Sequence, residues 1–364
     1  MADRMNESSP HHLPNRPLRT GYTTGACACA AAVAACQYFL TNTQVHEVRL
    51  IFPDGHERSL DVQCCWREGT GCAAEVIKDA GDDPDITHGI RIRSQITPRT
   101  DDQICFHAGE GVGTVTRRGL ALPPGEPAIN PGPREMIRTN LRRLTRQGFD
   151  VTIHIPDGKR LAQQTFNPKL GIVGGLSVLG RTGIVRPYSL EAMEESFRCH
   201  FRVLWNEGKR RLCFVPGNLG RAAALGAKLI SEELIVEVSN SWGVMIDYAA
   251  GFDLDHLWVV GHPGKLTKLM FGHWNTHSRH SPAAAPLLLN HLQQQFPELP
   301  SFSADDTGTV EALIQALTPQ HQKLIADHLA GEIRGKILAR VQHRWPVDVA
   351  LCNLKGEIIG QTRR

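Results

Sequence analysis

The sequence KLGIVGGLSVLGRTGIVRPYS, residues 169–189, is the stretch around which the chain is organised. Five glycines stand in it among apolar residues, and no acidic side chain occurs before Glu191. A backbone with so few side chains can pass close to a ligand, and its N–H groups can face an anion or a ribose. A helix predicted directly after it, with Ser189 as N-cap, would complete a loop-to-helix nucleotide site. A buried linker whose glycines permit tight packing explains the same residues, so both interpretations stay open here.

The bulk composition is typical of a soluble globular chain of about two domains. The 364 residues are 41% hydrophobic and 21% charged, and a formal net charge of +3 gives no signature of nucleic-acid binding. Ten cysteines without CxxC spacing indicate reduced core residues of a cytoplasmic protein. The apolar windows fall short of a membrane span, and residues 1–15 predict a flexible tail.

Residues 16–168 predict an α+β domain with a mixed sheet. A helix rich in alanine and cysteine is expected over residues 25–40, with a threonine cap. Strands on either side of a Pro-Asp-Gly turn follow at residues 45–66. The same order of helix, strand, Pro-Asp-Gly and strand returns over residues 135–166, which predicts a domain of two related halves.

Residues 169–364 predict a Rossmann-like, doubly wound α/β domain with C-terminal helices and a closing hairpin. Strands are expected at residues 212–215, 234–238 and 257–260, and each is followed by a turn and a helix. Ligands of such sheets bind beyond the carboxyl ends of the strands. The whole chain is therefore expected to combine the α+β and α/β classes.

Three short motifs resemble known sites without meeting their requirements. GEGVG at residues 109–113 is not followed by a helix, and GHPGK at residues 261–265 lacks the spacing of a phosphate loop. His273, His277 and His280 have the spacing of metal ligands but no acidic or cysteine partner nearby, which favours the wall of a polar pocket over a metal site.

Charged residues form two further candidates. The acidic stretch at residues 78–89 suits a network of caps and turns better than a calcium loop, with a catalytic carboxylate as the minority option. Arg134, Arg138 and Arg142 are four apart and share one face of a predicted helix. They form either a solvated basic face or a clamp for a ligand with several carboxylates.

Seven segments together resemble one family, the CbiD-type cobalt-precorrin-5B C1-methyltransferases. They span most of the chain in order, and their combination is specific although several are weak alone. The segments are LRTGYTTGACACAAA (18–32), EVIKDAGDDPDITHG (75–89), GEGVGTVTRRGLALPPGEPAINPGPREMI (109–137), FNPKLGIVGGLSVLGRTGIVRPYS (166–189), FVPGNLG (214–220), VSNSWG (238–243) and VVGHPGKLTKLMFGHWNTHS (259–278).

The resemblance implies methyl transfer from S-adenosylmethionine to ring carbon C1 of cobalt-precorrin-5B, which gives cobalt-precorrin-6A in anaerobic cobalamin biosynthesis. No enzyme-bound metal is expected, because the cobalt belongs to the substrate. Residues 16–168 are expected to contact the substrate and residues 169–364 to bind the cofactor. A homo-oligomer is possible, and neither nucleic acid nor membrane is expected as a partner.

Three groups of site residues follow as hypotheses from this resemblance. The cofactor pocket is expected to be lined by Gly174, Gly175, Gly217, Asn218, Asn240 and Gly261; substrate carboxylates to be held by Thr23, Thr24, Arg134 and Arg138; and a macrocycle proton to be moved by Asp79, His88 or His262. Two other functions stay open: a nucleotide-dependent ligase or oxidoreductase at the same sheet edge, and a corrinoid-binding carrier without catalysis.

Overall fold

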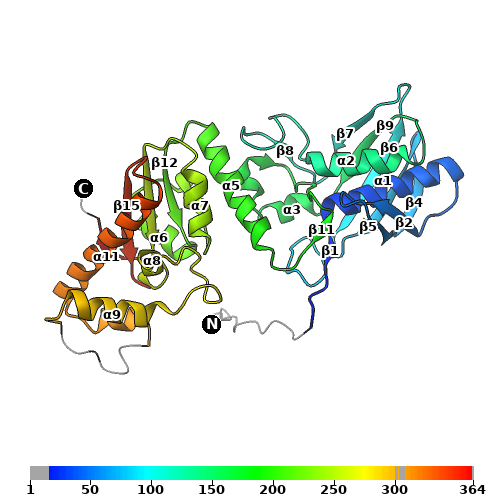
Figure 1. The fold of residues 1–364 in the computed structure, drawn as a ribbon. Coiled ribbons are helices and arrows are strands. Elements are labelled where there is room, and N and C mark those ends of the chain that lie inside the picture. Colours follow the sequence, from blue (N-terminus) through cyan, green and yellow to red (C-terminus); the bar gives the residue numbers. More distant parts are fainter. Residues whose placement is uncertain (1–15, 300–301, 303–307, 363–364) are drawn as a thin grey trace, which may run out of the picture. The chain divides into compact units, whose positions relative to one another are not determined.

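The computed structural model describes residues 16–299, 302 and 308–362, so the tail predicted over residues 1–15 lies outside them. The chain divides into an N-terminal unit, Met1–Ser189, and a C-terminal unit, Leu190–Arg364. Figure 1 shows the elements of both units, each of which is described by itself.

The division falls at Ser189 rather than at the predicted residue 168, because short strand pairs tie residues 169–189 to the N-terminal unit. These pairs are β1 (Gly21–Tyr22) with β11 (Ile184–Val185) and β8 (Thr114–Val115) with β10 (Ile172–Val173), all antiparallel. The glycine-rich stretch therefore completes the first unit instead of beginning the second.

The framework of the N-terminal unit is a mixed sheet, as the sequence predicts, and it has five strands. In spatial order its strands are β4 (Cys64–Glu68), β5 (Gly71–Ile77), β6 (Arg91–Pro98), β9 (Phe149–His154) and β7 (Ile104–Ala108). Neighbours are antiparallel except β9 and β7, which are parallel. The first Pro-Asp-Gly turn joins a separate antiparallel pair, β2 (Glu47–Ile51) and β3 (Glu57–Asp61).

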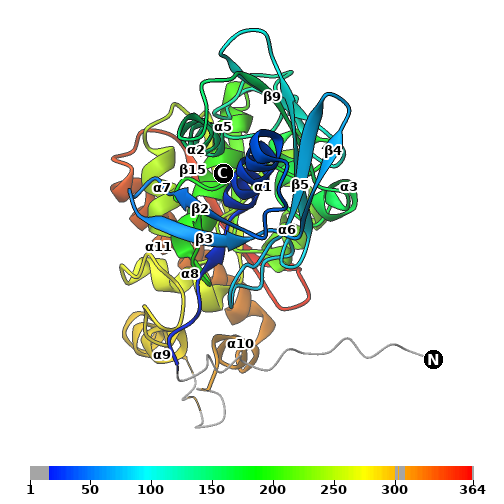
Figure 2. The same cartoon turned by 90° about the vertical axis from the view of Figure 1, so that its right-hand side faces the viewer.

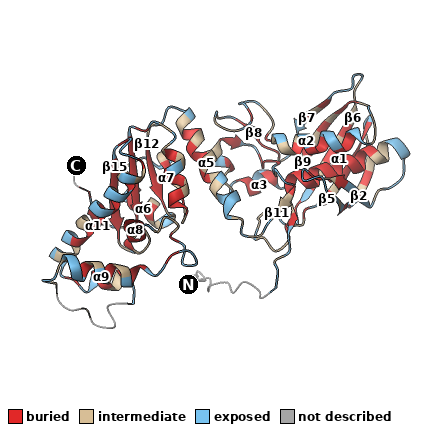
Figure 3. Cartoon of the chain, viewed as in Figure 1, coloured by how far each residue is buried: buried red, intermediate tan, exposed pale blue. Residues whose placement is uncertain are grey.

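The helix α1 (Thr24–Thr41) packs on β5, β6 and α2 (Pro131–Arg142), and Figure 2 shows it beside β5 and α2. Every residue from Thr24 to Cys36 is buried (Figure 3). Only small side chains allow this, because larger ones would hold the neighbouring elements away. By length and apolar composition α1 could cross a membrane, but 72% of it is buried inside the unit, which identifies a core helix.

The second Pro-Asp-Gly, residues 156–158, contradicts the predicted repeat. It leads into α3 (Gly158–Ala162), where a strand is expected, and the short helix α4 (Asn167–Leu170) follows. Gly158 lies so close to Gly111 that an added Cβ would stand 2.0 Å from the Gly111 carbonyl oxygen. This contact places the chain against the turn after β7, and no second hairpin forms.

The glycine-rich stretch crosses the N-terminal unit as a buried, extended segment at residues 175–178. The Leu176 N–H donates to the Gly111 carbonyl at 2.8 Å, and its own carbonyl accepts from the Gly113 N–H at 2.9 Å. An added Cβ on Gly175 would stand 2.1 Å from the Gly111 carbonyl oxygen. Here the glycines serve close packing of backbones, so the structure matches the buried-linker interpretation at these residues.

The C-terminal unit contains a second five-stranded mixed sheet. In spatial order its strands are β13 (Ile235–Glu237), β12 (Arg211–Val215), β14 (His256–Gly261), β15 (Val347–Cys352) and β16 (Ile358–Gln361). The first four are parallel, and β16 closes the predicted antiparallel hairpin. The described helices are α5 (Leu190–Asn206), α6 (Asn218–Gly226), α7 (Trp242–Ala249), α8 (Pro263–Met270), α9 (Ala284–Gln295), α10 (Val310–Gln315) and α11 (Pro319–Arg340), with a 3-10 turn at Glu232–Leu234.

The strand order of this sheet corrects one part of the prediction. Numbered along the chain, the strands run 2-1-3-4-5, which is the flavodoxin-like order rather than the Rossmann order 3-2-1-4-5. The sheet is covered on both faces, since Phe214 meets Phe201 of α5 with ring centroids 6.2 Å apart, while Cys213 packs with Ala223 of α6. In this topology the crevice for a ligand lies beyond the carboxyl ends of β12 and β14.

The contact between Gly175 and Gly111 predicts a stability difference. Gly175→Ala should lower the free energy of unfolding by about 2–3 kcal/mol, because the new methyl group meets a backbone carbonyl that cannot rotate away. Gly132→Ala is the matched control, since its Cβ would find the nearest atom at 3.4 Å, and a change within about 0.5 kcal/mol is expected. Urea denaturation followed by circular dichroism measures both, and equal stability of the two variants would contradict the packing role.

Candidate active site

The carboxyl edge of the C-terminal sheet gathers several predicted site residues. β12 leads into Gly217, and the exposed Asn218 is the first residue of α6. The nearest atom to a Cβ built on Gly217 is Oε1 of Glu237, at 3.9 Å. A ligand can therefore approach the backbone at the start of α6, where N–H groups point outward.

Glu237 is a candidate site residue that the sequence analysis did not name. It ends β13, and its carboxylate faces the Gly217 turn. An acid about 20 residues after such a glycine turn is the one that binds a ribose hydroxyl in dinucleotide folds, and this spacing was the available signal. Burial and Lys268 lower the pKa of the nearby Lys265, while the charge of Glu237 opposes that shift.

Asn240 anchors the loop that follows α8. Its side-chain oxygen accepts from the Thr276 hydroxyl at 3.0 Å, and its backbone carbonyl accepts from the Thr276 N–H at 3.1 Å. The buried Lys268 ammonium holds the same loop by donating to the Thr276 carbonyl at 3.1 Å and the Ser281 hydroxyl at 2.9 Å. Asn240 thus keeps its amide N–H₂ group available at the edge while its oxygen is engaged.

One histidine of this loop, His277, is held by a hydrogen bond within the loop. Nδ1 of His277 accepts from the Arg279 N–H at 3.1 Å, and its ring centroid lies 6.0 Å from that of His280. Within the described ranges, no three His, Cys, Asp or Glu side chains are grouped to hold a metal ion. The pocket wall predicted from His273, His277 and His280 stays a prediction.

His262, a predicted proton-transfer residue, caps α8 in the structure. Its Nδ1 accepts from the Gly264 N–H at 3.0 Å, so Nε2 carries the proton and donates to Glu311 at 2.8 Å. Both ring nitrogens are therefore engaged inside the unit, and the expected role of His262 in moving a macrocycle proton stays a prediction. Gly261 precedes His262. A Cβ on Gly261 would lie 3.0 Å from Pro216, so the missing side chain lets the turn after β14 lie close to the turn after β12.

The structure brings Asp79 and His88 together at the surface of the N-terminal unit, with Oδ1 and Nδ1 3.8 Å apart. A hydrogen bond from Arg19 is the main cause that lowers the pKa of the Asp79 carboxyl. Nδ1 of His88 accepts from the Ala80 N–H at 3.1 Å, so Nε2 carries the proton of the neutral ring, and the side chain is about half exposed. In this tautomer Nε2 of His88 is a hydrogen-bond donor, and the expected role of His88 in moving a macrocycle proton stays a prediction.

A buried ion pair holds the loop that carries Asp79 and His88. Only 1% of the Lys78 side chain is exposed, and its ammonium lies 2.7 Å from the Asp85 carboxylate. The other Asp85 oxygen accepts from the Thr87 N–H at 2.7 Å and from its hydroxyl at 2.6 Å. Burial alone would raise the pKa of Asp85, but the hydrogen bonds from Lys78 and Thr87 lower it.

Thr23 and Thr24, expected to bind substrate, are buried with engaged hydroxyl groups. The Thr23 hydroxyl caps α1 by accepting from the Ala26 N–H at 3.2 Å. The Thr24 hydroxyl accepts from the Leu179 N–H at 2.9 Å, which fixes the glycine-rich stretch to the start of α1. Neither side chain faces solvent, and the structure gives both a role in packing.

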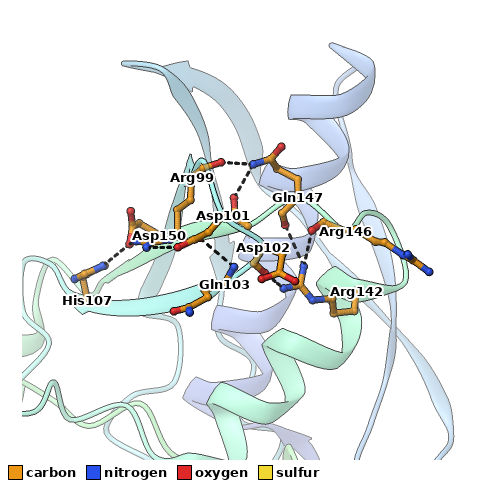
Figure 4. A network of polar contacts seen from close by, with 10 residues as sticks. Arg99, Asp101, Asp102, Gln103, His107, Arg142, Arg146, Gln147 and Asp150 are labelled. Atoms are coloured by element: carbon orange, nitrogen blue, oxygen red, sulfur yellow. Dashed lines mark hydrogen bonds and ion pairs between the residues drawn. The ribbon is translucent and has the colours of Figure 1, made fainter.

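Of the three arginines predicted to share a face of α2, two are used internally. The Arg134 guanidinium donates to the Ile129 carbonyl and to Glu126, both at 2.7 Å. Arg142 donates to carbonyls of Arg146, Gln147 and Asp102 in the network shown in Figure 4. Arg138 is exposed, with its guanidinium carbon 4.9 Å from the centre of the Phe106 ring.

The network in Figure 4 fixes the end of α2 to the sheet. Asp150 of β9 accepts from Arg99 at 2.9 Å and pairs with His107 of β7 at 2.8 Å. Gln147 donates to the Arg99 carbonyl at 2.5 Å. The polar groups of this network form hydrogen bonds with one another, so the network supports the helix that carries Arg138.

The remaining predicted cofactor residues, Gly174 and Gly175, belong to the N-terminal unit. Gly174 is exposed with φ of +90°, and no atom lies within 4 Å of a Cβ built on it. Gly175 is enclosed by Gly111 and Val112. The exposed apolar side chains of Val173 and Leu179 lie in the same stretch.

Comparison with known proteins identifies the family. The sequence model of CbiD matches residues 11–187, and that of the CbiD C-terminal domain matches residues 275–363. A protein of Syntrophotalea carbinolica named cobalt-precorrin-5B C(1)-methyltransferase is 44% identical over 94% of this chain and 97% of its own length. The chain belongs to the CbiD family. The resemblance predicted from the seven segments is thereby confirmed.

Other CbiD relatives extend the match. A Methanocaldococcus jannaschii protein of the same name is 38% identical over 93% of this chain and 95% of its own length. A crystal structure titled as the cobalamin biosynthesis protein CbiD of Archaeoglobus fulgidus is 29% identical, with a TM-score of 0.39 over 72% of this chain and 83% of that one.

The Lys78–Asp85 pair gives a test of the loop in this CbiD-family chain. Asp85→Asn should lower the free energy of unfolding by about 3 kcal/mol at pH 7, because it leaves a buried ammonium without its charged partner. Lys78→Met should cost less, because Asp85 keeps its bonds to Thr87 and partial exposure. Urea denaturation measures the loss in free energy of unfolding for both variants. A larger loss for Lys78→Met than for Asp85→Asn would contradict the prediction.

The stability that the same ion pair contributes should fall as the pH is lowered. The pKa of Asp85 is lower in the folded state, so its contribution is present above the unfolded pKa of about 3.9 and is lost as pH falls through the folded value. The stability gap between the unmodified chain and Asp85→Asn should therefore narrow below about pH 4. A gap that stays constant from pH 7 to pH 3 would show that the carboxylate charge is not involved.

Proposed function

We propose that this chain takes a methyl group from S-adenosylmethionine and transfers it to C1 of cobalt-precorrin-5B, giving cobalt-precorrin-6A. The chain is a cobalt-precorrin-5B C1-methyltransferase of cobalamin biosynthesis, since it matches a relative of that name at 44% identity over nearly the full length of both. That match is the observation that carries the reaction. The identity of the methyl donor, the location of its pocket and the roles of individual residues are our proposal.

S-adenosylmethionine suits the groups that the chain offers. Its sulfonium methyl is already activated, and its leaving group is a neutral thioether. Attack by an electron-rich macrocycle carbon therefore needs alignment of carbon, methyl and sulfur more than acid or base catalysis. Positive charge disperses in the transition state, so backbone carbonyls and neutral polar groups are better neighbours than ammonium groups.

We place the donor at the carboxyl edge of the C-terminal sheet. Glu237 would accept hydrogen bonds from the ribose hydroxyls, and Gly217 lets the nucleoside approach the start of α6. The exposed Asn218 and the free amide group of Asn240 are the polar side chains beside it. Gly261 and His262 support the edge by packing and capping rather than by contact with the donor.

We assign the carboxylates of the macrocycle to the N-terminal unit. Arg138 supplies an exposed guanidinium whose orientation is fixed by Phe106, and a guanidinium fork binds a carboxylate through two hydrogen bonds. His88 can add the Nε2–H donor that its ring presents, with Asp79 and Arg19 beside it. Gly174, with Val173 and Leu179 exposed near it, offers an apolar surface to the macrocycle.

The direct test is an anaerobic assay with S-adenosylmethionine labelled in the methyl group and cobalt-precorrin-5B. Label should appear in the macrocycle, with one S-adenosylhomocysteine released for each methyl transferred. If the macrocycle stays unlabelled while the chain binds it tightly, the chain is a corrinoid-binding carrier rather than an enzyme. If methyl transfer occurs only with a different methyl donor, the reaction stands and only the assignment of S-adenosylmethionine as the donor is wrong.

Two substitutions should separate the two ligands. Glu237→Gln should weaken S-adenosylhomocysteine binding about ten- to a hundredfold, as expected for a charge-assisted hydrogen bond, and leave KM for the macrocycle unchanged. Arg138→Gln should raise KM for the macrocycle by a similar factor and leave the donor affinity unchanged. Isothermal titration and initial rates measure these values.

The matched controls are Glu233→Gln and Arg146→Gln, which remove charges of the same kind at exposed positions of the same units. Both controls should behave as the unmodified chain. If Glu237→Gln affects only the macrocycle, or Arg138→Gln only the donor, the assignment of ligands to the two units is wrong.

A further inference from the structure

Two histidines of the C-terminal unit, neither of them assigned to methyl transfer above, bring their ring nitrogens together. Nε2 of His291 on α9 lies 3.3 Å from Nε2 of His328 on α11, with ring centroids 5.6 Å apart and ring planes 27° from parallel. We propose that this pair binds one divalent transition-metal ion, such as Zn²⁺, and so joins α9 to α11. The site stands independently of the methyl-transfer function.

The separation of the two nitrogens suits a shared ion. Zn–N bonds of about 2.0–2.1 Å at a tetrahedral angle place two imidazole nitrogens about 3.3–3.4 Å apart. Imidazole nitrogen is a preferred ligand of zinc, copper and nickel, whereas magnesium and calcium prefer oxygen. The pair is therefore selective for the borderline transition metals.

Aromatic neighbours orient both rings before an ion arrives. The Phe271 ring stands edge-on to His291 at 6.0 Å, and the Phe296 ring stands edge-on to His328 at 5.0 Å. An apolar shell of this kind limits solvent around a metal ligand and restricts its rotation. The two imidazoles come from separate helices, so an ion between them would bridge α9 and α11 rather than chelate a single turn.

Glu332 is an acidic neighbour of the pair rather than a placed third ligand. It lies four residues after His328, so both project from the same face of α11, and its charge acts on the His291 ring. The described residues contain no ready-made group of three metal-ligating side chains, so the ion would keep positions for water. An open groove of about 580 Å³ along α11, lined in part by Leu324, His328 and Gly331, gives an ion access.

Isothermal titration of the full chain, freed of any histidine tag, with ZnCl₂ tests the proposal, and MgCl₂ serves as the hard-ion control. One Zn²⁺ per chain should bind, and no Mg²⁺. His291→Ala and His328→Gln should each abolish that site, with circular dichroism unchanged. Co²⁺ bound in place of Zn²⁺ should give the visible absorption of a tetrahedral nitrogen site.

His277→Ala is the matched control, because it breaks the other described histidine pair with neighbouring rings, His277 with His280. Zn²⁺ binding should survive this substitution. The proposal is overturned if the unmodified chain takes up no Zn²⁺, since His291 and His328 then share only a proton. It is also overturned if His277→Ala removes the binding or if His291→Ala and His328→Gln retain it.

Discussion

The close approach of one backbone to another, allowed by small side chains, is the constraint on which the N-terminal unit depends. Gly111 contacts Gly158 and Gly175 with no room for a Cβ, and α1 is buried from Thr24 to Cys36. The two features are connected, because the Gly25 N–H donates to the Leu179 carbonyl at 2.9 Å. A tightly packed interior transmits displacement instead of absorbing it, so the loops on this framework take their positions from it.

The sequence predicted those elements whose signals are local. The cap and small residues of α1, the turn at residues 53–55 and the parallel strands of the C-terminal sheet all follow from neighbouring residues, and the structure confirms them. The turn at residues 156–158 misled the prediction, because the contact of Gly158 with Gly111 joins distant parts of the chain. The strand order of the C-terminal sheet is set in the same non-local way and was equally hidden.

Predicting the site met a different limit. Thr23, Thr24, Arg134 and His262 are polar residues in plausible places, but each completes a hydrogen bond inside its own unit. A sequence gives the chemistry of a side chain without its partners, and buried polar groups must find partners. Glu237 was missed for the converse reason: its nearness to Gly217 requires the pairing of β13 with β12. Among the predicted substrate-binding residues, Arg138 is exposed over the Phe106 ring and stays the clearest candidate to meet an anion.

The central claim is that the methyl donor is held at the carboxyl edge of the C-terminal sheet. The most direct measurement is a crystal structure of the full chain with S-adenosylhomocysteine bound. We expect the ribose hydroxyls to lie within hydrogen-bonding distance of Glu237 and the nucleoside to lie beside Gly217. A nucleoside bound instead at Gly174, with Glu237 empty, would contradict it.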